Sequence, residues 1–160
     1  MGGGGSLDPA GFEKMSGTYD KAGVRFLYPE TWEVTDELSG ELTRVISVQS
    51  PEGGFWALHV YPESVEPADL TAEVLQTLRQ EYDSLEAEPV TEKIGPAEAL
   101  GQDLEFYCLD LVVSARIRAF RQGERTYLVL AQAESREFDK LGDVFRAMTV
   151  SLLAGGSNRP

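Results

Sequence analysis

One stretch limits the possible folds more than any other, the ten residues GVRFLYPETW at positions 23–32. From Val24 to Tyr28 apolar side chains recur at every second position, so they share one face of an extended strand. Pro29 ends that strand because its nitrogen carries no hydrogen for a sheet ladder. Trp32 follows where its ring can cover the apolar face, and one aromatic ring buries roughly 150–250 Å². The stretch predicts a hairpin strand that starts a hydrophobic core.

The length of the chain favours a single domain. Its 160 residues, 42% of them apolar, are enough for one substantial core. We expect this domain to span residues 17–153. Residues 1–16 include the run GGGGS, which has the composition of a flexible leader or an added linker. Residues 154–160 have a similarly loose composition, and we expect them to form a flexible tail.

The charge of the chain makes two classes of partner unfavourable. It carries 27 acidic and 14 basic residues, a net charge of −13. Such a surface repels phosphate backbones and anionic lipid headgroups, so we expect another protein as the partner, with no nucleic acid and no membrane insertion. No apolar run approaches the ~18 residues of a membrane span, and no signal-peptide pattern is present. We expect a soluble cytoplasmic protein, a monomer or weak dimer, unless a native signal or lipid anchor was removed with the natural N-terminus.

Hydrophobic periodicity predicts the order of the strands and helices. The expected elements are strands at 17–20, 24–28, 42–50 and 54–61, a helix from Ala68 to about Leu85, strands at 90–94, 99–109, 111–121 and 126–133, and a closing helix from Ser135. The polar residues 35–40 are expected to form a loop. Asp69 or Thr71 is expected to cap the first helix, Pro89 to end it, and Ser135 to cap the second helix. Cys108 lies in an apolar strand and is expected to be a small buried hydrophobe.

This order of elements predicts the class of fold. Strands and helices do not alternate as they would in βαβ units, and each helix carries one apolar stripe. The chain is therefore expected to form an α+β domain, an antiparallel sheet flanked by helices. The strand at 54–61 is apolar on both faces, which places it at the centre of the sheet.

The motif in the opening stretch resembles a known family. Tyr28-Pro29-Glu30-Thr31-Trp32 after a strand is similar to the opening of the PsbP-like superfamily, which also includes Ran-binding Mog-type and bacterial DcrB-like proteins. RTYLVL at 125–130 and the helix ending in MTVSL at 148–152 are similar to the family's last strand and helix. The resemblance implies an α/β/α sandwich and a non-enzymatic role in binding or assisting another protein. It transfers no functional residue, because the family's docking surfaces are not shared.

Candidate catalytic groups are few. His59 is the one imidazole in the sequence, and no motif gives it a serine or cysteine partner. A structural role for His59 is therefore favoured over catalysis. One histidine and one cysteine cannot complete a zinc site, and the acidic pairs lack the spacing of a calcium loop. We expect no catalytic residue, no metal site and no cofactor.

A basic cluster is the best candidate for partner binding. Four arginines fall within ten residues of an otherwise acidic chain: Arg116, Arg118, Arg121 and Arg125. They could orient an acidic partner. The favoured alternative is that Arg116 and Arg118 form cross-strand pairs with Glu105 or Asp103, which contribute little to binding or stability.

Two classes of function stay open. The first is a protein-binding or accessory module. The second is a small-molecule-binding or hydrolytic domain with a pocket between a helix and the sheet, near His59, Tyr61 and Tyr107. A deep pocket with converging polar groups would favour the second class, and an exposed apolar or charged patch the first. Further candidate surfaces are the loop 38–42 and the aromatic pair Phe55 and Trp56.

Overall fold

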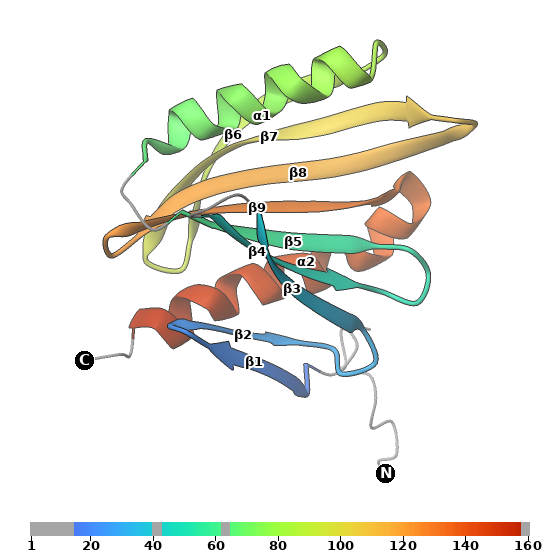
Figure 1. The fold of residues 1–160 in the computed structure, drawn as a ribbon. Coiled ribbons are helices and arrows are strands. Elements are labelled where there is room, and N and C mark those ends of the chain that lie inside the picture. The colour runs from blue at the N-terminus through green and yellow to red at the C-terminus, as the bar shows by residue number, and fades with distance from the viewer. Residues whose placement is uncertain (1–14, 40–42, 62–64, 158–160) are drawn as a thin grey trace.

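The computed structural model describes residues 15–39, 43–61 and 65–157. Figure 1 shows a sheet with a helix on each side and a short hairpin at one end. The elements in chain order are β1 (Gly17–Lys21), β2 (Val24–Tyr28), β3 (Glu33–Ser39), β4 (Thr43–Gln49), β5 (Phe55–Tyr61), α1 (Pro67–Glu81), β6 (Glu86–Ile94), β7 (Ala97–Cys108), β8 (Leu111–Gln122), β9 (Arg125–Glu134) and α2 (Ser135–Ser157).

The main sheet has seven antiparallel strands in the order β3-β4-β5-β9-β8-β7-β6. The chain builds one half as the meander β3 to β5. It then passes through α1 to the opposite edge and returns through β6, β7 and β8 to β9, which pairs with β5. α1 packs on β7, β8 and β9, and α2 covers the other face (Figure 1). The expected α+β fold with helices on both faces of an antiparallel sheet is confirmed.

The larger core lies between the sheet and α2. Alternate side chains of the central strands point into it, among them Ile46, Val48, Trp56, Leu58 and Val129. The predicted stripe of α2 supplies the opposite wall, since its aromatic and aliphatic members are all buried: Phe138, Leu141, Phe145 and Met148. Trp56 Nε1 donates a hydrogen bond to Thr149 Oγ1 at 3.1 Å, so the indole N–H has a partner inside this core.

A smaller core lies between the sheet and α1. Leu70 of α1 meets Phe106, Ile117 and Leu128, which point to this face from β7, β8 and β9. Tyr82, just after α1, stacks on Phe106 with ring centroids 4.2 Å apart. The apolar stripe predicted for this helix is therefore the face by which α1 packs on the sheet.

The predicted opening hairpin exists as β1 and β2, but it stands apart from the main sheet and packs on α2. Val24 and Phe26 are fully buried, and the Phe26 ring lies 4.8 Å from that of Trp56. Trp32 is only 3% exposed, and its ring meets Phe145 of α2 edge-on at 5.9 Å. The stretch at 23–32 therefore closes one end of the larger core against a helix.

The prediction of a loop at residues 35–40 is wrong for residues 35–39, the part that the structure describes. Residues 33–39 form β3, which pairs with β4 along its whole length and is an edge of the sheet. An edge strand can expose charged side chains, so a polar composition does not exclude it. Residue 40 lies outside the described residues.

The start of α1 also differs from the prediction. Neither Asp69 nor Thr71 caps the helix: the N-cap is Glu66, whose side chain makes no cap hydrogen bond, and Pro67 begins the helix. Thr71 Oγ1 instead donates to the carbonyl of Ala68. Proline suits the first helical position because its missing N–H would have no helical partner there.

The end of α1 comes earlier than predicted. The helix ends at Glu81, and Pro89 lies inside β6, which begins at Glu86 rather than at residue 90. β6 is an edge strand, where proline is tolerated because one row of backbone N–H groups faces away from the sheet. At the C-terminus, α2 runs to Ser157, four residues past the expected domain end at 153.

Candidate functional site

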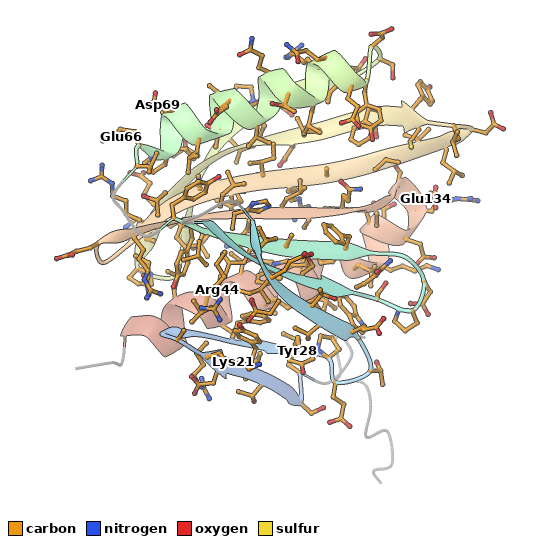
Figure 2. All side chains as sticks on the ribbon, in the orientation of Figure 1. Lys21, Tyr28, Arg44, Glu66, Asp69 and Glu134 are labelled. Atoms are coloured by element: carbon orange, nitrogen blue, oxygen red, sulfur yellow. The ribbon has the colours of Figure 1, made fainter. Side chains whose placement is uncertain are left out.

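The four candidate arginines do not form one surface. Arg121 Nη2 lies 2.6 Å from Glu66 Oε2, at the N-terminal end of α1 (Figure 2). Arg125 Nη2 donates to the carbonyl of Ala22 at 3.4 Å, in the turn between β1 and β2. Arg116 and Arg118 lie earlier in β8, on the face that α2 covers. Closeness in sequence therefore does not make a single basic patch.

Arg118 is consumed by contacts within the chain. It is 7% exposed, its Nε donates to Glu92 Oε1 at 2.6 Å, and its Nη1 donates to the carbonyl of Ile117 at 3.0 Å. Its Nη2 lies 2.8 Å from Asp103 Oδ1, a close charge contact without hydrogen-bond geometry. Of the cross-strand pairs considered from the sequence, Arg118 with Asp103 is the one that forms.

Glu92 links this arginine to α2. Its second carboxylate oxygen accepts a hydrogen bond from Arg146, which the sequence reading did not single out. Partial burial by itself raises the pKa of Glu92, but the hydrogen bonds from Arg118 and Arg146 outweigh it and hold the pKa below its ordinary value. The shared carboxylate joins β6, β8 and α2.

Arg116 has a different environment. Its guanidinium lies over the ring of Phe138 in α2, with the Cζ atom 4.8 Å from the ring centroid, a cation–π contact. Gly142 lies beside it, and a Cβ there would make an ordinary van der Waals contact at 3.7 Å from the nearest guanidinium nitrogen. Within residues 15–39, 43–61 and 65–157, no carboxylate lies at ion-pair distance from Arg116.

These arginines surround a small crevice between the sheet and α2, here called the arginine crevice. Its volume is about 30 Å³. Its charged lining consists of Arg116, Arg118, Arg146 and Glu92. Its apolar lining consists of Ile94, Val129, Ala131 and Phe145. Guanidinium groups beside apolar walls can hold an anion.

His59 lacks the surroundings of a catalytic base. It lies on β5 between Val45 of β4 and Leu128 of β9, and burial lowers its pKa below the ordinary value. Among the described residues, no acidic or hydroxyl side chain is hydrogen-bonded to its ring. No cluster of three or more metal-binding side chains occurs in the described part of the chain.

The aromatic residues expected near His59 are not together. Tyr61 pairs with Thr126 at the start of β9, whereas Tyr107 lies beside Val112 at the far end of β7 and β8. The prediction of one pocket near His59, Tyr61 and Tyr107 is therefore wrong, because Tyr107 lies away from the other two residues. The fully buried Trp56 likewise removes the aromatic pair with Phe55 from the candidate surfaces, and the loop 38–42 lies largely outside the described residues.

The turn between β7 and β8 is the feature that the sequence reading missed. Cys108 pairs with Leu111, which leaves a two-residue loop of Leu109 and Asp110. Leu109 has φ +58°, a left-handed conformation that L-residues with bulky side chains rarely adopt. The first loop residue of the two other hairpins in the same half of the sheet is glycine, Gly95 with φ +60° and Gly123 with φ +65°.

This turn also exposes apolar side chains. Tyr107, Leu109 and Leu111 are 62%, 94% and 49% exposed, and they are the large hydrophobic residues exposed among those described. We call residues 107–111 the hairpin tip, which projects past the neighbouring elements at the right of Figure 1. Cys108, predicted to be buried, is only partly buried here.

The side of the hairpin tip is acidic. A hollow of about 100 Å³ beside it is lined by Glu86 and Glu105 together with Ser84, Tyr107 and other residues. Asp110 lies in the turn itself, and Tyr107 N donates to Ser84 Oγ at 3.1 Å. Tyr107 thus shares this hollow with two carboxylates, and the lining contains no arginine or lysine.

A separate polar cluster, formed by Tyr19, Asp36 and Arg44, ties the β1–β2 hairpin to the sheet. The hydroxyl of Tyr19 is hydrogen-bonded to both Asp36 and Arg44, and Arg44 Nη2 also donates to the carbonyl of Lys21 at 3.2 Å (Figure 2). Burial and the hydrogen bond to Asp36 raise the pKa of Tyr19 to about 12. Tyr19 therefore stays protonated near neutral pH, and the cluster holds a hairpin in place.

Comparison with known proteins identifies the fold. No protein-family model and no curated protein sequence matches the chain. The solution structure of cyanobacterial PsbP (CyanoP) from Synechocystis is similar with a TM-score of 0.62 at 12% identity, covering 90% of this chain and 98% of that one. LpqN of Mycobacterium tuberculosis, described as involved in cell envelope biogenesis, matches with a TM-score of 0.50 at 16% identity, covering 78% and 79%. A Bacteroides thetaiotaomicron protein matches with a TM-score of 0.51 at 13% identity, covering 79% of this chain and 46% of that one.

Identities this low establish the arrangement of the chain and nothing finer. No helix within residues 15–39, 43–61 and 65–157 is long and apolar enough to cross a bilayer. The match to PsbP extends over nearly the whole of both chains, as the resemblance in the opening and closing stretches implied. The chain has the PsbP-like α+β fold.

Proposed function

We propose that this chain is a non-enzymatic accessory domain that binds another protein through the hairpin tip. The observation that carries the proposal is Leu109, which is 94% exposed and held at a positive φ. Both properties work against the stability and solubility of the free chain. A binding role accounts for both.

Leu109 is unfavourable in its position in two ways. An L-residue in the left-handed region costs roughly 1–2 kcal/mol relative to its preferred conformations. The chain has glycine at the same loop position in its two other hairpins of this sheet half, Gly95 and Gly123, where that cost is avoided. The leucine also places its apolar surface in water. In a complex, the same side chain would gain free energy by entering an apolar pocket.

The surroundings of the tip indicate the chemistry of the partner. Glu86, Glu105 and Asp110 lie around the apolar side chains. Carboxylates repel anionic lipid headgroups, so a membrane surface is disfavoured as the target. The complementary surface is an apolar pocket on a protein, with lysine or arginine residues at its rim.

The fold supports this proposal, as does the lack of a catalytic grouping around His59 in the part of the chain that the structure describes. The PsbP-like resemblance implies proteins that bind or assist other proteins, which is an analogy of fold. The apolar cross-strand neighbours of His59, Val45 and Leu128, supply neither a nucleophile nor an orienting acid. The arginines at 118, 121 and 125 are turned to partners within the chain, and they do not carry the proposal.

A photo-crosslinking experiment tests the proposal. A photoreactive amino acid replaces Leu109 in one variant and the exposed Glu124, in the turn between β8 and β9, in a matched control. In cells of the source organism, irradiation should give a discrete crosslinked protein from position 109 and not from 124. Mass spectrometry then identifies that protein, which is purified for calorimetry.

Calorimetry with the purified partner gives the quantitative result. Leu109→Asp should weaken binding at least tenfold, whereas Glu124→Ser should leave it unchanged. Unchanged binding by a folded Leu109→Asp variant would refute the assignment. Crosslinking of position 109 to a second copy of the chain, or flotation of the protein with lipid vesicles, would replace the proposed partner by self-association or a membrane.

A further inference from the structure

The arginine crevice contains an excess of positive charge. Arg116, Arg118 and Arg146 face two carboxylates, Glu92 and Asp103. One formal positive charge is left unmatched, in a chain whose net charge is −13. The chain has many more carboxylates than basic groups. The absence of a third carboxylate beside these three arginines is therefore a feature of this crevice and does not follow from the composition.

Of the three arginines that line the crevice, Arg116 is the one without a counter-ion among the described residues. One face of its guanidinium lies against the Phe138 ring, which stabilises the charge without using any N–H group. No hydrogen bond from its N–H groups to a described residue is formed. The planar edge of the group is therefore available for an acceptor.

Arg146 can supply the second donor. Its Nη1 donates to Glu92, and its Nη2 donates to the carbonyl of Lys93 at 3.3 Å. Its Nε has no partner among the described residues. Arg118 donates to Glu92 and to two backbone carbonyls, and its Nη2 lies against Asp103, so we assign it a contribution of charge.

The size and walls of the crevice decide which anion fits. A volume of about 30 Å³ holds two or three water-sized groups, since a single water needs roughly 10–15 Å³. The planar guanidinium edge can hold a carboxylate or a phosphate, but a three-atom carboxylate fits this small space better than a five-atom phosphate. The apolar walls of Ile94, Val129 and Phe145 lower the local dielectric and strengthen the attraction.

We propose that the arginine crevice binds a carboxylate group, held by Arg116 and by Arg146 Nε. The group belongs either to a small organic acid or to the free C-terminus of a peptide, whose remaining atoms stay outside the crevice. This site is separate from the hairpin tip, so the two proposals stand or fall independently. The crevice lies between β8 and α2. It would therefore contact a small ligand or the C-terminal tail of a partner at a different place from the hairpin tip.

Titration by NMR tests the site with acetate as the probe. The Nε–Hε signals of Arg116 and Arg146 are followed in the full ¹⁵N-labelled chain at constant ionic strength. Sodium acetate should shift both signals along a saturating curve, whereas sodium chloride should shift neither. Inorganic phosphate should bind more weakly than acetate, and tighter binding of phosphate would overturn the carboxylate assignment.

Two variants separate binding from a structural role. Arg116→Gln should weaken acetate binding at least tenfold, whereas Arg125→Gln, which removes an arginine outside the crevice, should leave it unchanged. Backbone spectra and thermal midpoints establish that both variants are folded; if Arg116→Gln does not fold, Arg116→Lys, which keeps the charge but loses the planar edge, takes its place. Equal acetate affinity in the tested variant and the parent chain, or a shift that never saturates, would refute the proposal.

A pair of peptides distinguishes the two sources of the carboxylate. A short uncharged peptide with a free C-terminus is compared with its amidated form, and succinate represents a small organic acid. Tighter binding of the free peptide than of acetate and succinate assigns the site to a chain terminus. Tighter binding of succinate assigns it to an organic acid, and failure of all of these carboxylates to bind would overturn the site.

Discussion

Replacement of Leu109 by glycine should stabilise the free chain, although it removes a large side chain. The left-handed conformation at φ +58° costs leucine roughly 1–2 kcal/mol, and glycine adopts it without that cost. Glycine also gains freedom in the unfolded chain, which opposes the gain by roughly 0.5–1 kcal/mol. Leu109 is 94% exposed, so almost no burial is lost. The net expectation is a stabilisation of about 0.5–1 kcal/mol.

Gly123 provides the reverse substitution as a control. It has φ +65° at the equivalent position of the β8–β9 hairpin, and a Cβ added there would meet nothing within 4 Å. Gly123→Leu therefore tests the conformational cost without a steric clash. It should destabilise the chain by about 0.5–1 kcal/mol, the opposite sign of Leu109→Gly.

Urea denaturation measures both changes. Each variant is compared with the parent chain by its midpoint and slope, and an unchanged slope allows the midpoint shift to be read as a free energy. The corresponding shift of the thermal midpoint is about 1–4 °C for a chain of this length. If Leu109→Gly were less stable than the parent chain by more than about 0.5 kcal/mol, Leu109 would be making stabilising contacts, and the argument for a binding role would fail.

Three further substitutions test the core and the ion network. Arg118→Glu should cost about 3–5 kcal/mol in urea denaturation, because it buries a third carboxylate beside Glu92 and Asp103; a loss below about 1 kcal/mol would contradict the buried network. Trp32→Ala should cost about 3–5 kcal/mol, because the ring is 3% exposed against α2; a small loss would indicate an exposed ring. Because folding lowers the pKa of Glu92 below its ordinary 4.5, its contribution to stability should be fully present above that pH and should be lost as pH drops through the lowered pKa; Glu92→Gln should make the acid loss of stability shallower, and an equal slope in both proteins would rule out the assignment.

The sheet was predictable because strand alternation is a local property. The strand at 54–61 is apolar on both faces, and β5 is indeed an interior strand with cores on both sides. β3 was not predicted, because it is an edge strand and does not show the apolar pattern of an interior strand. Its sequence EVTDELS carries polar groups that an edge strand exposes, so periodicity could not distinguish it from a loop.

The candidate site was only partly predictable. Alternation along β8 places Arg116 and Arg118 on one face and Arg121 on the other, so the sequence already contained the signal that the cluster divides. Arg146 could not be found in this way, because its position beside Glu92 depends on how α2 packs on the sheet. The hairpin tip carried a weak signal: two strands joined at Leu109 and Asp110 without glycine.

The proposed interface at the hairpin tip calls for a partner of the opposite charge to the one expected from the arginine cluster. The arginine cluster in the sequence suggested an acidic partner, but Arg118 and Arg121 already pair with carboxylates of the same chain. The surface that remains exposed and apolar has Glu105 and Asp110 at its side. A basic partner should therefore associate faster at low salt, and the rate should fall as ionic strength rises. Because the apolar anchor Leu109 is insensitive to salt, the dissociation rate should change far less, so the two rates separate the steering charges from the anchor.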